Sequence, residues 1–231
     1  MNLFQRQIFG TKKNTYNPLF RYNASVQNGA VYNDVSGNNN NGLAISTVPT
    51  YRTQPWTSDT NYDYYGNNAP FSIPVSLGNL FCSSTNKFSL MTGDYPDNGG
   101  TSAGQKQTII RYGTGTNVNC NLCIYNEYTA SGIYNIVVNI RGLNTTVLTG
   151  VTRLKRIIQF TWDGFTAKIH VEGNLYTVPI GSNSEITGLS ITCYNNYKGE
   201  FSEINGWDKS FSQSELAVIR SMRNFTYGVV L

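Results

Sequence analysis

The sequence predicts an all-β protein, a two-sheet antiparallel jelly-roll sandwich with one short C-terminal helix. Three observations support this prediction: β-branched and aromatic runs separated by Gly-rich turns, one hairpin signature, and a single helix-capping pattern near the end. Many strands followed by one late helix are typical of a sandwich. At 231 residues the chain can bury a large core without a metal or disulfide staple.

The N-terminal third predicts an arm and then short strands. Residues 1–20 are polar with scattered apolar positions and are expected to form an extended arm, with a first edge strand as the alternative. Residues 21–224 are expected to form the domain and 225–231 a C-terminal tail. Residues 21–80 are rich in Asn, Tyr, Pro and Gly, which indicates short strands, such as 48–51 and 71–77, joined by long loops.

Strand signals become clearer after residue 87. Apolar runs predict strands over 88–91, 108–112, 118–128 and 133–141. Two alternating runs, 156–162 and 165–171, flank Asp163-Gly164, the signature of a type I′ hairpin turn. On the second run Phe165, Ala167, Ile169 and Val171 share one face. The single histidine, His170, lies on the other face and is expected to be a partly exposed sheet residue rather than a catalytic base.

The expected helix begins near the C-terminus. Ser212 and Glu215 form a capping box, and Leu216, Ile219 and Met222 follow at helical spacing.

Composition and charge exclude several classes of protein. Charged residues make up 13% of the chain, against about 25% in an average domain, and Asn, Ser, Thr, Gly and Tyr supply the polarity. Such surfaces suit contacts with sugars or proteins. The net charge of +4 is spread along the chain, which argues against nucleic acid as a partner. No window has the apolar length of a membrane span, and no Sec-type signal is recognised.

The four cysteines are expected to be buried free thiols. They are Cys82, Cys120, Cys123 and Cys193. The Cys120–Cys123 spacing invites a metal or redox interpretation, but on a strand Cys120 would share a face with Leu122 and Ile124 while Cys123 faces the other way. The two thiols are therefore not expected to share an ion or a disulfide.

Three segments resemble the concanavalin A-like, laminin-G-like jelly-roll family of lectins, some glucanases, and phage and bacterial surface proteins. Residues 34–42 resemble its early Asp-x-Ser-Gly-Asn loop, 160–173 its central hairpin, and 201–215 its closing strand and helix. The resemblance covers about residues 22 to 224. It implies two face-to-face antiparallel sheets and loops available for ligands.

The resemblance is compatible with three functions, because this fold occurs in enzymes, in lectins and in structural modules. The glucanase pattern Glu-x-Asp-x-x-Glu is absent, and the nearest acidic pairs are Glu200 with Glu203, on opposite faces of a strand, and Asp59 with Asp63 in a loop. No nucleophile elbow is present. The sequence therefore predicts no enzymatic activity and no catalytic residues.

The best binding candidate is an aromatic and amide-rich loop within residues 56–68. Its rings could stack on sugars and its polar groups could read hydroxyls, or the same rings could pack against the sandwich or a partner subunit. The candidate residues are Trp56, Asp59, Asn61, Tyr62, Asp63, Tyr64, Tyr65 and Asn67. Asp34, Asn38 and Asn40 are weak candidates for Ca²⁺ ligands, with Asx-rich turns as the commoner explanation. No other cofactor is expected.

A virion component reconciles the lectin-like resemblance with the missing export signal, because a phage product is made in the cytoplasm and meets glycans after lysis. Free thiols agree with cytoplasmic synthesis. The sequence-based prediction is a phage head-fibre, capsid decoration or tail-associated protein located in the virion. It would bind other virion proteins through the arm and tail, meet host cell-surface glycans, and form a homo-oligomer. The alternatives are a free carbohydrate-binding lectin and, third, a glycoside hydrolase.

Overall fold

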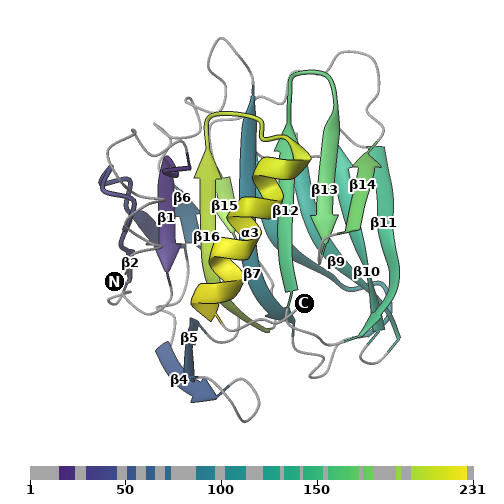
Figure 1. The fold of residues 1–231 in the computed structure, drawn as a ribbon. Coiled ribbons are helices and arrows are strands. Elements are labelled where there is room, and N and C mark those ends of the chain that lie inside the picture. Colours follow the sequence, from purple (N-terminus) through teal and green to yellow (C-terminus); the bar gives the residue numbers. More distant parts are fainter. Residues whose placement is uncertain are drawn as a thin grey trace.

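Two antiparallel sheets packed face to face form the body of the molecule, as Figure 1 shows for the computed structural model. The all-β sandwich predicted from the sequence is therefore confirmed. The structure describes residues 16–23, 30–45, 51–55, 61–65, 71–73, 87–96, 102–112, 122–130, 133–140, 143–152, 156–171, 174–178, 191–193 and 199–227.

The first sheet, sheet A, contains eight of the described strands. Its order is β14 (Asn174–Val178), β13 (Ala167–Val171), β12 (Arg156–Trp162), β7 (Phe88–Pro96), β16 (Gly199–Trp207), β5 (Asn61–Tyr65) and β4 (Tyr51–Pro55), and β1 (Phe20–Asn23) also pairs with β16. The hairpin β4–β5 ends this sheet and extends beyond its main body (Figure 1).

Sheet B also contains eight described strands. Its order is β11 (Leu143–Thr152), β10 (Ile133–Ile140), β9 (Leu122–Ala130), β8 (Lys106–Tyr112), β15 (Ile191–Cys193), β6 (Phe71–Ile73), β3 (Gly42–Ala44) and β2 (Val31–Tyr32). The sequence analysis names no strand at β11, whose residues are mostly polar. The run predicted over 118–128 is described as a strand only from Leu122 onward.

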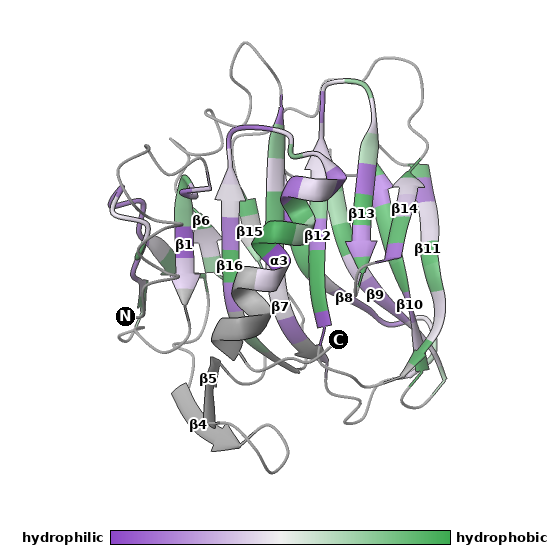
Figure 2. Cartoon of the chain, in the orientation of Figure 1, coloured by the Kyte–Doolittle hydropathy of each residue, from purple (hydrophilic) through white to green (hydrophobic). Residues whose placement is uncertain are grey.

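The core lies between the sheets because alternate strand residues point inward. Phe160 and Trp162 of β12 face Ile110 of β8 and Ile124 of β9 within one apolar cluster. Figure 2 shows the resulting alternation of apolar and polar residues along β12 and its neighbours. Cys123 is excluded from this cluster and packs with Tyr125 and Val137 on the opposite face of sheet B. The predicted orientation of Cys123 is confirmed, and Cys123 and Cys193 are buried and form no disulfide, whereas Cys82 and Cys120 lie outside the described residues.

The helix α3 (Gln213–Tyr227) covers the outer face of sheet A (Figure 1). Its predicted capping box is present: Ser212 N donates to Glu215 Oε2 at 2.8 Å, and Glu215 N donates to Ser212 Oγ at 3.3 Å. The bond from the Ser212 backbone lowers the pKa of the Glu215 carboxyl. Leu216 and Ile219 pack on Met91, Ile157 and Trp207. Strand β12 is therefore buried on both faces.

The hairpin between β12 and β13 differs from its prediction in turn type and in one side chain. Trp162 pairs with Ala167, which leaves a four-residue loop, and Gly164 has φ 98° while Asp163 does not have a positive φ. A type I′ turn requires both to be positive, so that prediction is wrong. Asp163 Oδ1 instead accepts the amides of Phe165 and Thr166. Phe165, predicted to share a face with Ala167, Ile169 and Val171, belongs to this loop and is 81% exposed, whereas those three residues are buried.

The folded part of the chain continues beyond both predicted domain boundaries, residues 21 and 224. The arm predicted over 1–20 reaches into the fold at its C-terminal end, since Phe20 is buried in the core and Trp207 Nε1 donates to the Tyr16 carbonyl at 2.9 Å. Helix α3 continues to Tyr227, into the segment assigned to the tail. Residues 1–15 and 228–231 lie outside the described residues.

Candidate functional site

The candidate binding segment is a strand hairpin over the part that the structure describes. Asn61 to Tyr65 form β5, which pairs along its whole length with β4, so the prediction of a loop is wrong for these five residues. Trp56, Asp59 and Asn67 lie outside the described residues. Because consecutive residues of a strand alternate between two faces, Asn61, Tyr62, Asp63, Tyr64 and Tyr65 cannot all meet one ligand from one side.

The hairpin projects because only its base is attached to the rest of sheet A. Of the residues of β5, only Tyr65 has a paired residue, Phe201, in β16. The remainder of β5 has β4 as its partner, and Figure 1 shows both strands extending past the end of the sandwich. Among the described strands β4 has β5 as its one partner, so its other edge can accept a ligand or a partner strand.

A buried ion pair lies beside the base of this hairpin. One row of paired residues crosses sheet A from Tyr65 through Phe201 and Asp94 to Arg156. Arg156 Nε and one terminal nitrogen donate to the two oxygens of Asp94, each at 2.8 Å, and both side chains are at most 1% exposed. This pair was not predicted from the sequence, although Arg156 is two residues from the inward-facing Ile158 on the same strand and therefore points to the same side.

The ion pair also joins the two sheets. Arg156 donates to Asn126 Oδ1 on β9 of sheet B at 2.8 Å, and its guanidinium lies 5.0 Å from the ring centroid of Tyr134 on β10. Charge-assisted hydrogen bonds with two partners fix a guanidinium in one orientation. This network therefore holds the two sheets together at the end of the sandwich that carries the hairpin.

The loop proposed as a weak Ca²⁺ site is organised as an Asx-rich turn. Asp34 Oδ1 accepts the amides of Arg21 and Ser36, and Asp34 Oδ2 accepts the Ser36 hydroxyl and the Asn40 amide, all within 2.9 Å. Four donors use the four lone-pair positions of a carboxylate. A cation at Asp34 would have to displace them, so the structure favours the turn over the Ca²⁺ site.

The two asparagines of that candidate site also have structural partners. Asn38 Nδ2 and Asn40 Nδ2 each donate to the Leu19 carbonyl, at 3.0 and 2.9 Å. The Tyr22 hydroxyl donates to the Asn40 carbonyl, and burial raises the pKa of this phenol, which keeps it neutral. These bonds attach the loop to the segment leading into β1. Within the described residues, no group of three or more His, Cys, Asp or Glu side chains could hold a metal.

The acidic pair considered for glycosidase chemistry is only partly described. Glu203 is 1% exposed and forms an ion pair with Arg21 at 3.0 Å, and Asn205 donates to its other oxygen. A carboxylate neutralised in this way is not exposed to a substrate. The side chain of Glu200 lies outside the description.

His170 is buried on the face of sheet A that α3 covers, so the expectation of a partly exposed side chain is wrong. It lies on β13 opposite Gln159 of β12 and is 3% exposed. Gln159 Nε2 donates to the Leu216 carbonyl of α3 at 2.9 Å, which places the histidine next to a contact between helix and sheet. Burial lowers the pKa of His170, and the nearby charges of Arg220 on α3 and Lys168 on β13 lower it further.

Acidification is expected to destabilise the fold through His170. Because its pKa is lowered in the folded state, the unfolded state binds the proton more readily, so stability is retained above about pH 6.5 and falls as the pH drops below it. Urea unfolding at pH 7 and pH 5 should show this decrease. It should be smaller in His170→Gln, and an equal decrease in both proteins would contradict the assignment.

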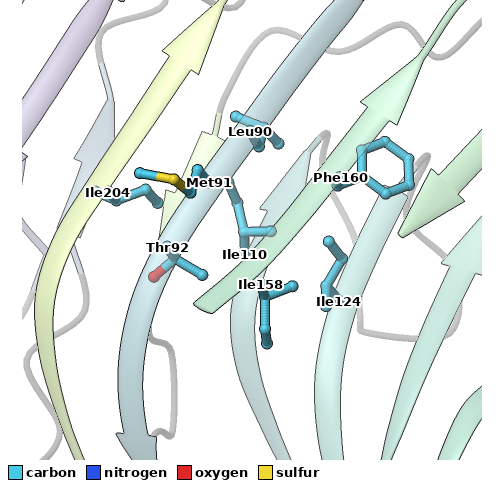
Figure 3. Close-up of a pocket in the computed structure, with 8 residues that line it drawn as sticks. All are labelled: Leu90, Met91, Thr92, Ile110, Ile124, Ile158, Phe160 and Ile204. Carbon is cyan, nitrogen blue, oxygen red and sulfur yellow. The ribbon is translucent and has the colours of Figure 1, made fainter. Parts of the chain in front are cut away.

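One cavity between the two sheets is too small for a ligand. This cavity has a volume of about 10 Å³ and is lined by side chains of both sheets, as Figure 3 shows. The lining residues are Leu90, Met91, Thr92, Ile110, Ile124, Ile158, Phe160 and Ile204. A water molecule needs about this volume together with two or more polar partners, which this lining does not supply. This cavity is therefore too small and too apolar to hold a ligand.

Comparisons with known proteins identify the fold. Scanning the sequence against family models gives no match, and no curated protein sequence matches either. The receptor binding domain of a botulinum neurotoxin C/D mosaic serotype is similar in structure, with a TM-score of 0.61, 11% identity, and coverage of 89% of this chain and 51% of the neurotoxin chain. At this identity the similarity shows a shared β-sandwich.

Two further solved structures share the fold. The serotype D ligand binding domain of botulinum neurotoxin, in complex with N-acetylneuraminic acid, has a TM-score of 0.61, 12% identity, and coverage of 89% and 51%. A Trypanosoma rangeli sialidase has a TM-score of 0.61, 12% identity, and coverage of 87% and 32%. The chain thus spans about half or a third of the length of these proteins.

Among the described residues, no helix has the length and apolar character needed to cross a membrane.

Proposed function

We propose that this protein is a non-enzymatic, lectin-like module that binds glycans with the hairpin β4–β5. The observation that carries the proposal is this hairpin, which projects from a β-sandwich and carries four tyrosines together with one Asn and one Asp. The same fold occurs in a neurotoxin domain in complex with N-acetylneuraminic acid and in a neurotoxin of type C whose cell entry depends on two ganglioside molecules. Aromatic rings stacking on sugar faces and amides bonding to hydroxyls would supply the affinity.

A glycan array with and without Ca²⁺, together with size-exclusion chromatography, tests this function. Saturable binding to one class of glycan supports the proposal. Since the donors around Asp34 leave no carboxylate oxygen open, the signal is expected to be the same with Ca²⁺ and with EDTA. A silent array would contradict glycan binding, and a defined oligomer in the same buffer would then favour an architectural role.

Tyr64→Ala is expected to weaken glycan binding by about ten- to one hundredfold, because a stacked ring contributes on the order of 1–3 kcal/mol. Isothermal titration calorimetry measures the change. Phe165→Ala is the matched control, since Phe165 is an exposed ring at the opposite end of β12 from the hairpin row. Equal binding by both variants and the unmodified protein would exclude the hairpin as the site.

A more specific proposal is that this glycan-binding module is part of a virion, as a phage head-fibre, capsid decoration or tail-associated protein. Its support is the resemblance of residues 34–42, 160–173 and 201–215 to a family that includes phage surface proteins. The test is copurification with particles in a fixed stoichiometry. A deletion should remove residues 1–15 only, because Tyr16 and Phe20 contact the fold. A free lectin would be unaffected by this deletion, and a glycoside hydrolase would release sugar from the glycan it binds.

A further inference from the structure

A group of exposed apolar side chains lies at the β2 edge of sheet B. Val31 of β2 pairs with Leu43 of β3, and the two side chains are 37% and 58% exposed. Tyr32 points into the core, so its neighbour Val31 and the paired Leu43 point to the outer face of sheet B. Ile45, two residues after Leu43, is 53% exposed. Val31, Leu43 and Ile45 together are called the β2–β3 patch.

The β2–β3 patch differs from the other exposed apolar side chains of the described residues. Those outside residues 31–45 lie one each in β10, β11, the β12–β13 loop, β14 and α3. Single exposed apolar residues are ordinary on a protein surface, whereas neighbouring ones mark an interaction site. Residues 30–45 contain one charged side chain, Asp34, whose carboxylate accepts four hydrogen bonds from the chain itself. Since charged side chains usually protect a sheet edge from association, this edge is suited to an apolar partner.

The N-terminal segment, residues 1–15, has the composition of such a partner. It contains no acidic residue, and its large aliphatic and aromatic residues are Leu3, Phe4, Ile8 and Phe9. The segment joins the fold at Tyr16, whose carbonyl accepts a hydrogen bond from Trp207 Nε1. A chain of this length spans roughly 50 Å when fully extended, so these apolar residues can reach beyond their own domain.

The point where this segment joins the fold lies on the opposite side of the sandwich from the patch. Tyr16 packs on the cluster between α3 and sheet A, with its ring centroid 5.9 Å from that of Phe211. The patch lies on the outer face of sheet B. Within one chain the segment would have to pass round the edge of the sandwich and across the polar loop 34–41, where Asn38 Nδ2 donates to the Pro18 carbonyl at 3.1 Å. A second copy of the chain can offer its patch without this crossing.

We propose that the β2–β3 patch binds the N-terminal segment of a second copy of this chain, with apolar side chains of that segment covering Val31, Leu43 and Ile45. Reciprocal exchange of two segments would close a dimer, whereas transfer in one direction from copy to copy would build a ring or a filament. Because the contact is apolar, added salt should not weaken it. The patch belongs to sheet B and the hairpin β4–β5 to sheet A, so this proposal does not depend on glycan binding.

Sedimentation velocity of the full chain over a range of concentrations tests the contact. The chain is expected to self-associate, and Leu43→Asn in the patch and Phe4→Ser in the segment should each weaken association by about ten- to one hundredfold. Leu143→Asn is the matched control, since Leu143 is a 45% exposed leucine on β11, at the opposite edge of sheet B. An equal mixture of the Leu43→Asn and Phe4→Ser chains should associate more tightly than either alone, because it restores one intact segment on one intact patch.

Each other outcome overturns a stated part of the proposal. A full chain that stays monomeric at every concentration excludes a second copy as the partner, and association unchanged in Leu43→Asn excludes the patch. Weakening in Leu43→Asn but not in Phe4→Ser, or no recovery in the mixture, excludes the N-terminal segment as the occupant. If Leu43→Asn fails to fold by circular dichroism, Ile45→Asn tests the same patch. Tyr64→Ala tests the hairpin separately, so the failure of either proposal leaves the other standing.

Discussion

Replacing Asp94 by alanine is expected to lower the free energy of unfolding by about 3 to 5 kcal/mol. The substitution leaves the Arg156 guanidinium, which is 1% exposed, between two sheets without its carboxylate partner. The contact to Asn126 cannot neutralise the charge, because an amide oxygen carries no net charge. Denaturation in urea, followed by circular dichroism, measures the loss.

Two controls distinguish the buried charge from a general sensitivity of the fold. The double variant Asp94→Leu with Arg156→Met removes both charges and should recover most of the lost stability. Lys209→Ala removes one partner of the exposed pair with Glu215, 3.2 Å apart, and should cost less than about 1 kcal/mol. A loss below 1 kcal/mol in Asp94→Ala would show that Arg156 finds water or another partner.

Leu216→Ala is expected to cost about 2 to 5 kcal/mol by opening a cavity between α3 and sheet A. Leu216 is 1% exposed and packs with Met91, Ile157 and Trp207. Its carbonyl, which accepts from Gln159 Nε2, remains in the variant, so the loss reports packing. The measurement is urea unfolding followed by fluorescence, with Trp207 as a reporter inside the affected cluster.

Val218 on the same helix supplies the matched control. It is 44% exposed, and Val218→Ala should change stability by less than about 0.5 kcal/mol. Similar losses in both variants would mean that helix propensity, rather than burial against the sheet, determines the contribution of α3. A loss in Leu216→Ala accompanied by a lower denaturant slope would instead indicate that the helix detaches before the sandwich unfolds.

Local patterns predicted the central strands and the helix correctly. The alternation over 156–162 and the capping box at Ser212 and Glu215 each depend on residues close in sequence, and both are present. The type of turn was predicted less reliably than the strands and the helix. Asp163-Gly164 favoured a two-residue turn, but the side chain of Asp163 stabilises a longer loop and exposes Phe165.

The candidate site was only partly predictable, because the structure of residues 61–65 depends on pairing with another strand. The composition of residues 56–68 indicated a binding segment, but its high content of Asn and Tyr suggested a loop, whereas pairing with β4 makes Asn61 to Tyr65 a strand. The burial of His170 could not be predicted, because it depends on a helix some fifty residues later in the chain.

The β-sandwich class, the shared faces of alternate residues in the central strands, the orientation of Cys123 and the start of α3 could all be predicted from the sequence. All of these follow from hydrophobic periodicity and capping, which act over a few residues. The contact of Asp94 with Arg156, the burial of His170 and the projection of β4 and β5 became apparent only in the folded structure. These features depend on strand order and register, since pairing brings together residues that are tens of positions apart in the sequence.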